Sequence, residues 1–120
     1  MASRIDIKME ESSDQALLVH VRGQLSFETI YAFEEAIGPL FAKNYREISL
    51  DCGNMDYIDS TGLGTLVKYY NLSHDRGITF TLYNLSHGIR EILDTANLSQ
   101  FFITGGNGEN ALPKKARTNR

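Results

Sequence analysis

The chain has 120 residues with 42% hydrophobic and 22% charged side chains, which fits one globular domain, leaves little room for a second and excludes a largely disordered protein. The net charge of -3 conceals an asymmetry, because the last eight residues contain four basic side chains and no acidic one, leaving 8 basic and 15 acidic residues, or -7, in the rest. An acidic body argues against nucleic acid as a partner, since phosphate binding relies on clustered Lys and Arg.

The first part of the chain predicts a β-hairpin followed by a helix. A strand near Ile5 to Met9 is joined through the turn-rich "EESSDQ" to a second strand in "ALLVHVRG", which we expect Gly23 to end. Ser26 is then positioned as the N-cap of a helix in "FETIYAFEEAIGPLFA". Pro39 is expected to kink or shorten the end of that helix.

The second part of the chain alternates strands with helical patterns. We expect a strand in "REISLDCG" and then a helix from Thr61 to Arg76, closed by a left-handed Gly77. A strand from Ile78 to Tyr83 follows, and then a helix in "SHGIREILDTANL" that is capped by Ser86 and ends at Asn97. The last expected elements are a strand in "QFFITGG" and a short helix in "GNGENALPKKAR". Strands that alternate with helices of this length imply crossover connections. The fold class is therefore α/β with a mainly parallel sheet.

The stretch "DYIDSTGLGTLVKYY" places two glycines, Gly62 and Gly64, in the first turn of a predicted helix. Each costs about 1 kcal/mol relative to alanine inside a helix. Ser60 is expected at the N-cap, where its hydroxyl accepts a hydrogen bond from a first-turn N–H, and capping alone is one interpretation of this serine. The glycines favour a second interpretation, because missing side chains let another molecule approach Ser60 closely.

Phosphorylation would turn such a serine into a switch. A phosphate on Ser60 would add about -1.5 to -2 charge at a helix N-terminus, where the free N–H groups and the helix dipole tolerate it. A partner docked over the helix end, beside Asp59, would instead meet repulsion and a desolvation cost. The residues alone therefore suggest a phospho-switch on a binding surface.

Signatures of enzymes and metal sites are missing from the sequence. His20, His74 and His87 lie on separate elements without metal-ligand spacing, Ser60 is not in a G-x-S-x-G elbow, and the two glycines are too few for a nucleotide-binding loop. The single cysteine, Cys52, permits no internal disulfide and is expected to be a buried, inert thiol. We therefore predict a protein that is not an enzyme and that has no metal and no cofactor.

The two ends of the chain carry predictions about location and domain bounds. "MASRIDIKMEESSD" lacks the apolar core of a signal peptide, and no run approaches the roughly 18 apolar residues of a membrane span, so we expect a cytoplasmic protein without a membrane partner. Residues 1–112 are expected to form the domain and residues 113–120 a basic, flexible tail. That tail also permits interpretation as a nucleic-acid or membrane arm.

The segment "LDCGNMDYIDSTGLGTLVKYY" resembles the central motif of STAS domains, the family named for sulphate transporters and anti-sigma-factor antagonists. The resemblance continues through "RGITFTLYNLSHGIREILDTANLSQFFI" and upstream through "VRGQLSFETIYAFEEAI", so it covers about residues 15 to 112, and it is strongest to the stand-alone bacterial antagonists. It implies a single STAS domain with a mixed five-stranded sheet packed by about four helices. It also implies a non-enzymatic partner-switching role in signal transduction.

In that role, an anti-sigma factor that is also a serine protein kinase binds the unmodified antagonist and phosphorylates it, and a PP2C-type phosphatase reverses the modification. Carried onto this chain, the resemblance implies phosphorylation of Ser60, in a setting of Asp59, Thr61 and Gly62. Many antagonists carry Asp where this chain has Ser26, which is otherwise explained as an N-cap. The positions implied for partner binding are Gln24, Ser26, Thr29, Leu63, Gly64 and Lys68.

Two further function classes remain open on the sequence. STAS-like domains also occur as scaffolds or subunits of stress-signalling and of lipid or anion transport assemblies, where the serine goes unphosphorylated. An enzyme with Ser60 as nucleophile would need a general base that the sequence does not place.

Overall fold

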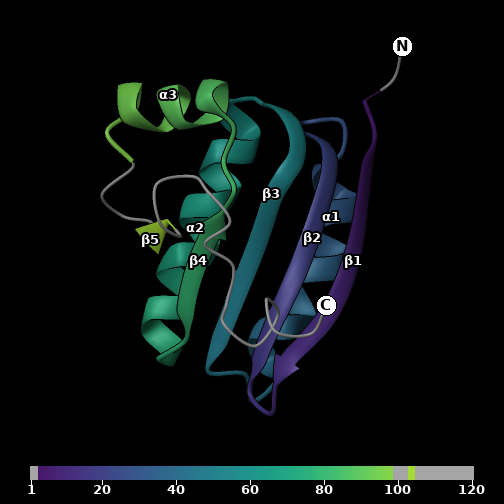
Figure 1. Ribbon diagram of the computed structural model, residues 1–120, viewed down its shortest axis with the longest axis vertical. Helices are drawn as coiled ribbons and strands as arrows, with labels where there is room; N and C mark the ends of the chain where they lie inside the picture. The colour runs from purple at the N-terminus through teal and green to yellow at the C-terminus, as the bar shows by residue number, and fades with distance from the viewer. Residues whose placement is uncertain (1–2, 99–102, 105–120) are drawn as a thin grey trace.

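The computed structural model of the chain, shown in Figure 1, describes residues 3–98 and 103–104. The elements are β1 (Ile5–Ser13), β2 (Ala16–Leu25), α1 (Ile30–Ile37), the 3-10 helix η1 (Gly38–Ala42), β3 (Glu47–Ile58), α2 (Ser60–Arg76), β4 (Thr79–Tyr83), α3 (His87–Thr95) and β5 (Ile103–Thr104). The strands form one sheet in the order β1-β2-β3-β4-β5, in which β1 is antiparallel to β2 and the other neighbours are parallel.

This arrangement confirms the predicted α/β class and the mixed, mainly parallel sheet. The predicted numbers of strands and helices, five and about four, are matched only in part. Four strands of five or more residues and three α-helices make up the described chain, and β5 contributes two residues beside β4. The short helix expected in "GNGENALPKKAR" and the basic tail 113–120 lie outside the described residues.

One hydrophobic core lies between the sheet and the helices behind it. In Figure 1, α1 lies behind β1 and β2, α2 lies behind β3 and β4, and α3 crosses the upper end of the molecule. Alternate strand residues face this core, as expected for a sheet with period-two side chains. The buried residues from the two longest parallel strands and the two helices include Leu17, Val19, Val21, Ile48, Leu50, Cys52, Phe33, Ile37, Leu66 and Tyr69.

The prediction that Gly23 ends its strand is wrong, because β2 continues to Leu25. Gly23 has φ +108°, and a Cβ at this position would lie 2.2 Å from the carbonyl oxygen of Arg4. The register of β2 against β3 shifts between Gly23 and Gln24, which is the irregularity of a β-bulge. Gly23 therefore permits a bulge where β2 pairs with the start of β1, and it does not end the strand.

The predicted N-cap at Ser26 is also wrong, because α1 begins at Ile30. Thr29 occupies the N-cap position without a side-chain cap hydrogen bond, and Ser26 is buried in the preceding turn. The reason is that residues 26–29 form a turn of their own, in which the Thr29 N–H donates to the Ser26 carbonyl over 3.0 Å. The helix starts only after this turn.

Other helix ends agree with the sequence. α1 ends at Ile37 and the chain continues as a 3-10 helix with Pro39 in its first turn, which confirms the shortening. Gly77 closes α2 with φ +70°, the Ser86 hydroxyl accepts a hydrogen bond from the Ile89 N–H over 3.2 Å, and Asn97 has φ +60°. Each of these ends depends mainly on the backbone or side-chain chemistry of one residue.

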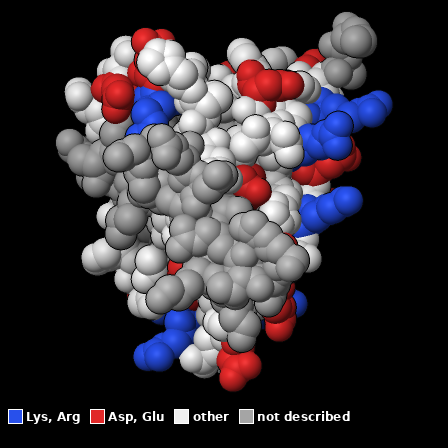
Figure 2. Space-filling view, viewed as in Figure 1, with Lys and Arg blue, Asp and Glu red and all other residues white. Residues whose placement is uncertain are grey.

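The viewed face of the molecule mixes both signs of charge. Figure 2 shows Lys and Arg side chains along the edge where β1 lies, and Asp and Glu side chains over α3 and at the opposite end. On the part of this face that is described, basic side chains do not merge into the broad patch that nucleic-acid binding requires. None of the helices within residues 3–98 is both long enough and apolar enough to cross a bilayer.

Candidate functional site

The start of α2 is organised by Asp59, which is its N-cap. The Asp59 backbone is extended, and its carboxylate oxygen Oδ1 accepts a hydrogen bond from the Gly62 N–H over 2.9 Å. The prediction that Ser60 is the N-cap is therefore wrong: Ser60 is the first helical residue. The reason lies in the strand before it, since β3 pairs with β2 up to Ile58 and the Asp59 N–H still donates to the Leu25 carbonyl.

Asp59 also fixes the loop that precedes α1. Its second carboxylate oxygen, Oδ2, accepts a hydrogen bond from the Phe27 N–H over 3.0 Å. The same carboxylate thus joins two segments that are far apart in the sequence, the turn at residues 26–29 and the first turn of α2. Because a charged acceptor strengthens both hydrogen bonds, Asp59 is the main polar link between these segments.

Ser60 lies exposed at this helix end, and so does Thr61. Within the described residues, the N–H groups of Gly62 and Leu63 donate to Asp59, whereas no acceptor is found for the N–H groups of Ser60 and Thr61. Unpaired first-turn N–H groups and the positive end of the helix dipole favour an anion at this place. The arrangement therefore offers an accessible hydroxyl beside donors that suit a phosphate.

The two glycines of the first turn have different surroundings. Gly62 is buried, and a Cβ there would lie 2.4 Å from the Leu25 carbonyl oxygen and 2.8 Å from Cγ1 of Ile58. At Gly64, which is exposed, an added Cβ would meet nothing within 4 Å. The expectation that both glycines clear a path for a partner is thus corrected: Gly62 lets α2 pack against β2, and only Gly64 leaves open surface.

Two of the positions expected to contact a partner are turned inward. Ser26 and Thr29 are 2% and 5% exposed. The Thr29 hydroxyl accepts a hydrogen bond from the Ser26 N–H and donates one to the Gln24 carbonyl over 2.8 Å. Their side chains are internal supports of the loop and expose little surface in the free chain, and their part in partner binding stays a prediction.

The remaining predicted positions lie at or near the surface. Gln24 is half-buried and donates from its amide to Asp56 over 2.9 Å, and Leu63 is half-buried on α2. Gly64 and Lys68 are exposed on the same helix, and the Lys68 ammonium forms an ion pair with Glu34 of α1. The structure therefore places Leu63, Gly64 and Lys68 in the first half of α2 and Gln24 beside the last residues of β3.

Three exposed aromatic side chains are not among the six positions predicted for partner binding. Phe27 is 68% exposed, Tyr31 83% and Tyr57 51%. A signal for the first two was present, because Phe27 and Tyr31 fall outside the apolar stripe of the first helix, which contains Ile30 and Phe33. Large apolar residues off the buried stripe are candidates for contact with another molecule.

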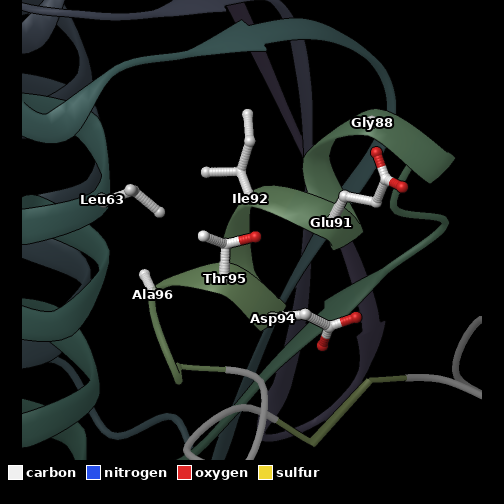
Figure 3. A pocket seen from close by; sticks show the side chains of 7 residues that line it. All are labelled: Leu63, Gly88, Glu91, Ile92, Asp94, Thr95 and Ala96. Atoms are coloured by element: carbon white, nitrogen blue, oxygen red, sulfur yellow. The ribbon is translucent and has the colours of Figure 1, made fainter.

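A groove lies between α3 and Leu63 of α2. Its volume is about 730 Å³, and it is lined by Leu63, Gly88, Glu91, Ile92, Asp94, Thr95 and Ala96. In Figure 3, Leu63 points from α2 toward α3, whereas the carboxylates of Glu91 and Asp94 point away from α2. The groove thus has an apolar floor and acidic side chains on its outer rim.

Reactive chemistry is limited in the described part of the chain. Burial, together with the charge of Asp51, raises the pKa of the Cys52 thiol to about 12, which makes it a poor nucleophile. Among residues 3–98, no three His, Cys, Asp or Glu side chains are grouped so that they could hold a metal ion. The described residues thus offer neither an activated thiol nor a group of metal ligands.

Known proteins resemble this chain in sequence and in fold. A curated relative, the anti-sigma-B factor antagonist of Bacillus subtilis strain 168, is 25% identical over 109 residues, which cover 91% of this chain and 96% of the relative. The solved anti-sigma factor antagonist from Mycobacterium paratuberculosis is similar with a TM-score of 0.78 and 22% identity over 90% of this chain and 91% of that chain. The Bacillus cell fate determinant SpoIIAA in its phosphorylated form gives a TM-score of 0.66 and 14% identity over 87% of this chain and 95% of that chain.

The two structural likenesses show a shared fold, since their sequence identities are low. The names of the relatives are those of regulators and not of enzymes, in agreement with the prediction that this chain is not an enzyme. The family model described as "STAS domain" matches residues 6–111, almost the whole chain. The chain belongs to the STAS domain family.

Proposed function

We propose that the chain is an anti-sigma-factor antagonist that works as a phospho-switch. With Ser60 unmodified it binds an anti-sigma factor that is also a serine protein kinase, and with Ser60 phosphorylated it releases this partner. A PP2C-type serine phosphatase restores the unmodified form. The names of the relatives support the anti-sigma-factor partner, and the phosphorylated state of one solved relative supports the modification.

The observation that carries the proposal is the exposed Ser60 hydroxyl at the first position of α2, with the cap already supplied by Asp59. A kinase can reach this hydroxyl without first breaking a capping hydrogen bond. The product would be a group of about -1.5 to -2 charge beside the Asp59 carboxylate. The N–H groups of Ser60 and Thr61, which have no acceptor among the described residues, would compensate this charge within the free protein.

Release of the partner follows from the same charges. When a protein covers the start of α2, water is removed from Ser60 and Asp59, and two neighbouring anionic groups become costly to bury. A phosphate therefore destabilises the complex more than it destabilises the free chain. Phosphorylation acts as a switch because it weakens the complex more than it weakens the free chain.

Intact-mass spectrometry tests the modification directly. The chain is incubated with ATP and with each anti-sigma-factor-type serine kinase of the organism that encodes it. We expect the addition of a single phosphate that is lost in Ser60→Ala and retained in Thr61→Ala, which removes the neighbouring exposed hydroxyl. A phosphate that persists in Ser60→Ala would refute the assignment.

Binding measurements test the switch. We expect Ser60→Ala to bind the kinase as tightly as the unmodified chain, and Ser60→Asp to stay folded but bind at least about tenfold more weakly, a loss of about 1.4 kcal/mol or more. Equal affinity of both variants for the partner, with no phosphate added, would instead favour a scaffold or a subunit of a transport assembly.

A further inference from the structure

The two most exposed large hydrophobic side chains of the described residues are Tyr31, at 83%, and Phe27, at 68%. They are four positions apart, in the turn that leads into α1 and in the first turn of that helix. Both residues therefore lie at the N-terminal end of α1, one just before the helix and one in its first turn. Aromatic side chains bury about 150–250 Å² each when covered, so leaving both in water forgoes a large stabilisation unless another molecule covers them.

This aromatic pair is fixed to the candidate phosphorylation site. The Phe27 N–H donates to Asp59, the cap of α2, and α1 is tied to α2 by the ion pair between Glu34 and Lys68. The loop behind Phe27 is further held by the buried hydroxyl of Thr29. Because the loop is already ordered, covering the pair costs little conformational entropy.

We propose that Phe27 and Tyr31 are the main apolar anchors for the kinase that phosphorylates Ser60. The inference rests on the proposed function and names the surface by which the partner recognises this chain. The occupant is the kinase because Phe27 shares the Asp59 carboxylate with the first turn of α2, so a protein that reaches Ser60 is brought against the aromatic pair. On the partner, the pair requires an apolar pocket for two rings, with a polar group for the Tyr31 hydroxyl.

Ser26 and Thr29 acquire a role in this scheme. Their side chains are buried and bonded within the loop, so they hold the backbone in the conformation that leaves Phe27 outside. Two of the six positions predicted for partner binding, Ser26 and Thr29, would thus support the residue that makes the contact. In this scheme Phe27 and Tyr31 bind the kinase, and only Ser60 is chemically modified.

Steady-state phosphorylation kinetics test the inference, with the kinase identified by phosphate transfer to Ser60. Phe27→Ser and Tyr31→Ser are expected each to raise KM for the protein substrate at least about tenfold while kcat stays near the parental value, as for interface anchors. Tyr31→Phe keeps the ring and is expected to keep KM near that of the parent. All variants change exposed side chains, so unchanged circular dichroism and thermal unfolding are expected to confirm that they fold.

Two matched control variants test whether the rise in KM is specific to Phe27 and Tyr31. Met9→Ala removes an apolar side chain that is 44% exposed on β1, and Ile92→Ala removes one that is 36% exposed in the groove between α2 and α3. Both are expected to leave KM unchanged. Parental KM in the Phe27 and Tyr31 variants, or a raised KM only in Ile92→Ala, would overturn the inference while the proposed function stands. If no kinase transfers phosphate to Ser60, the proposed function fails and this inference fails with it.

Discussion

Alanine at Gly62 and alanine at Gly64 are expected to change stability in opposite directions. Neither glycine has a positive φ, so alanine is conformationally acceptable at both, and the two positions differ only in the space available. At Gly64 an added Cβ meets nothing within 4 Å. Gly64→Ala is therefore expected to stabilise the protein by about 0.5–1 kcal/mol, the ordinary advantage of alanine over glycine in a helix.

At Gly62 the same methyl group would lie 2.4 Å from the Leu25 carbonyl oxygen and 2.8 Å from Cγ1 of Ile58. An ordinary contact needs at least 3.4 Å, so the start of α2 must move by about 1 Å from the backbone of β2. That movement also strains the hydrogen bond from the Asp59 N–H to the Leu25 carbonyl. Overpacking of this kind costs about 1–3 kcal/mol, which outweighs the helix propensity gain and leaves Gly62→Ala destabilised by about 1–2 kcal/mol.

Urea unfolding of the two variants and the parent, followed by circular dichroism under one set of conditions, measures the difference. We expect the urea midpoints to lie on opposite sides of the parent, with unfolding free energies of the two variants that differ by about 1.5–3 kcal/mol. If Gly62→Ala unfolds within about 0.5 kcal/mol of the parent, the close packing of α2 on β2 is not what excludes a side chain there. If both variants lose stability equally, open space at Gly64 is refuted.

Three further predictions concern other parts of the chain. Partial burial lowers the pKa of His20, but the hydrogen bonds and charges of Glu10, 3.0 Å from Nε2, and Asp51, 2.9 Å from Nδ1, outweigh it and raise the pKa above 6.5. The stabilisation by this imidazolium is thus complete below about pH 6.5 and is lost as the pH rises through the raised pKa, so His20→Gln is expected to cost more stability near pH 6 than near pH 9 in urea unfolding. The Cys52 thiol, with its pKa raised to about 12 by burial and the charge of Asp51, is expected to react with a disulfide reagent at mildly alkaline pH only after unfolding, which a spectrophotometric assay follows. Because Asn97 has φ +60°, Asn97→Ala is expected to be about 1 kcal/mol less stable than Asn97→Gly, as measured by thermal unfolding.

The sequence predicts the fold class and those element ends that depend on a single residue. Apolar periodicity switches between two and 3.6 residues along the chain, which is enough to place strands and helices alternately. Gly77 and Asn97 adopt the left-handed conformation that their side chains tolerate, and Pro39 cannot continue a helix. Such features are local, so they are visible without a structure.

The corrections at the start of α2 and in the turn before α1 depend on contacts between distant segments. Asp59 and Ser60 are both good N-caps, and the choice between them is made by the pairing of β3 with β2. The space beside Gly62 is closed by Leu25, and the burial of Ser26 follows from the attachment of its turn to Asp59. No local pattern contains this information.

The correction at the start of α2 strengthens the case for Ser60 as the modified residue. A serine that caps a helix has its hydroxyl oxygen bonded to a first-turn N–H, and loss of such a cap costs about 1 kcal/mol, so phosphorylation would compete with the helix itself. In this chain Asp59 holds the Gly62 N–H, and the neighbouring hydroxyl is left exposed. Asp59 caps the helix, so the Ser60 hydroxyl has no capping role. Phosphorylation of Ser60 is therefore expected to change what this surface binds without unfolding the start of α2.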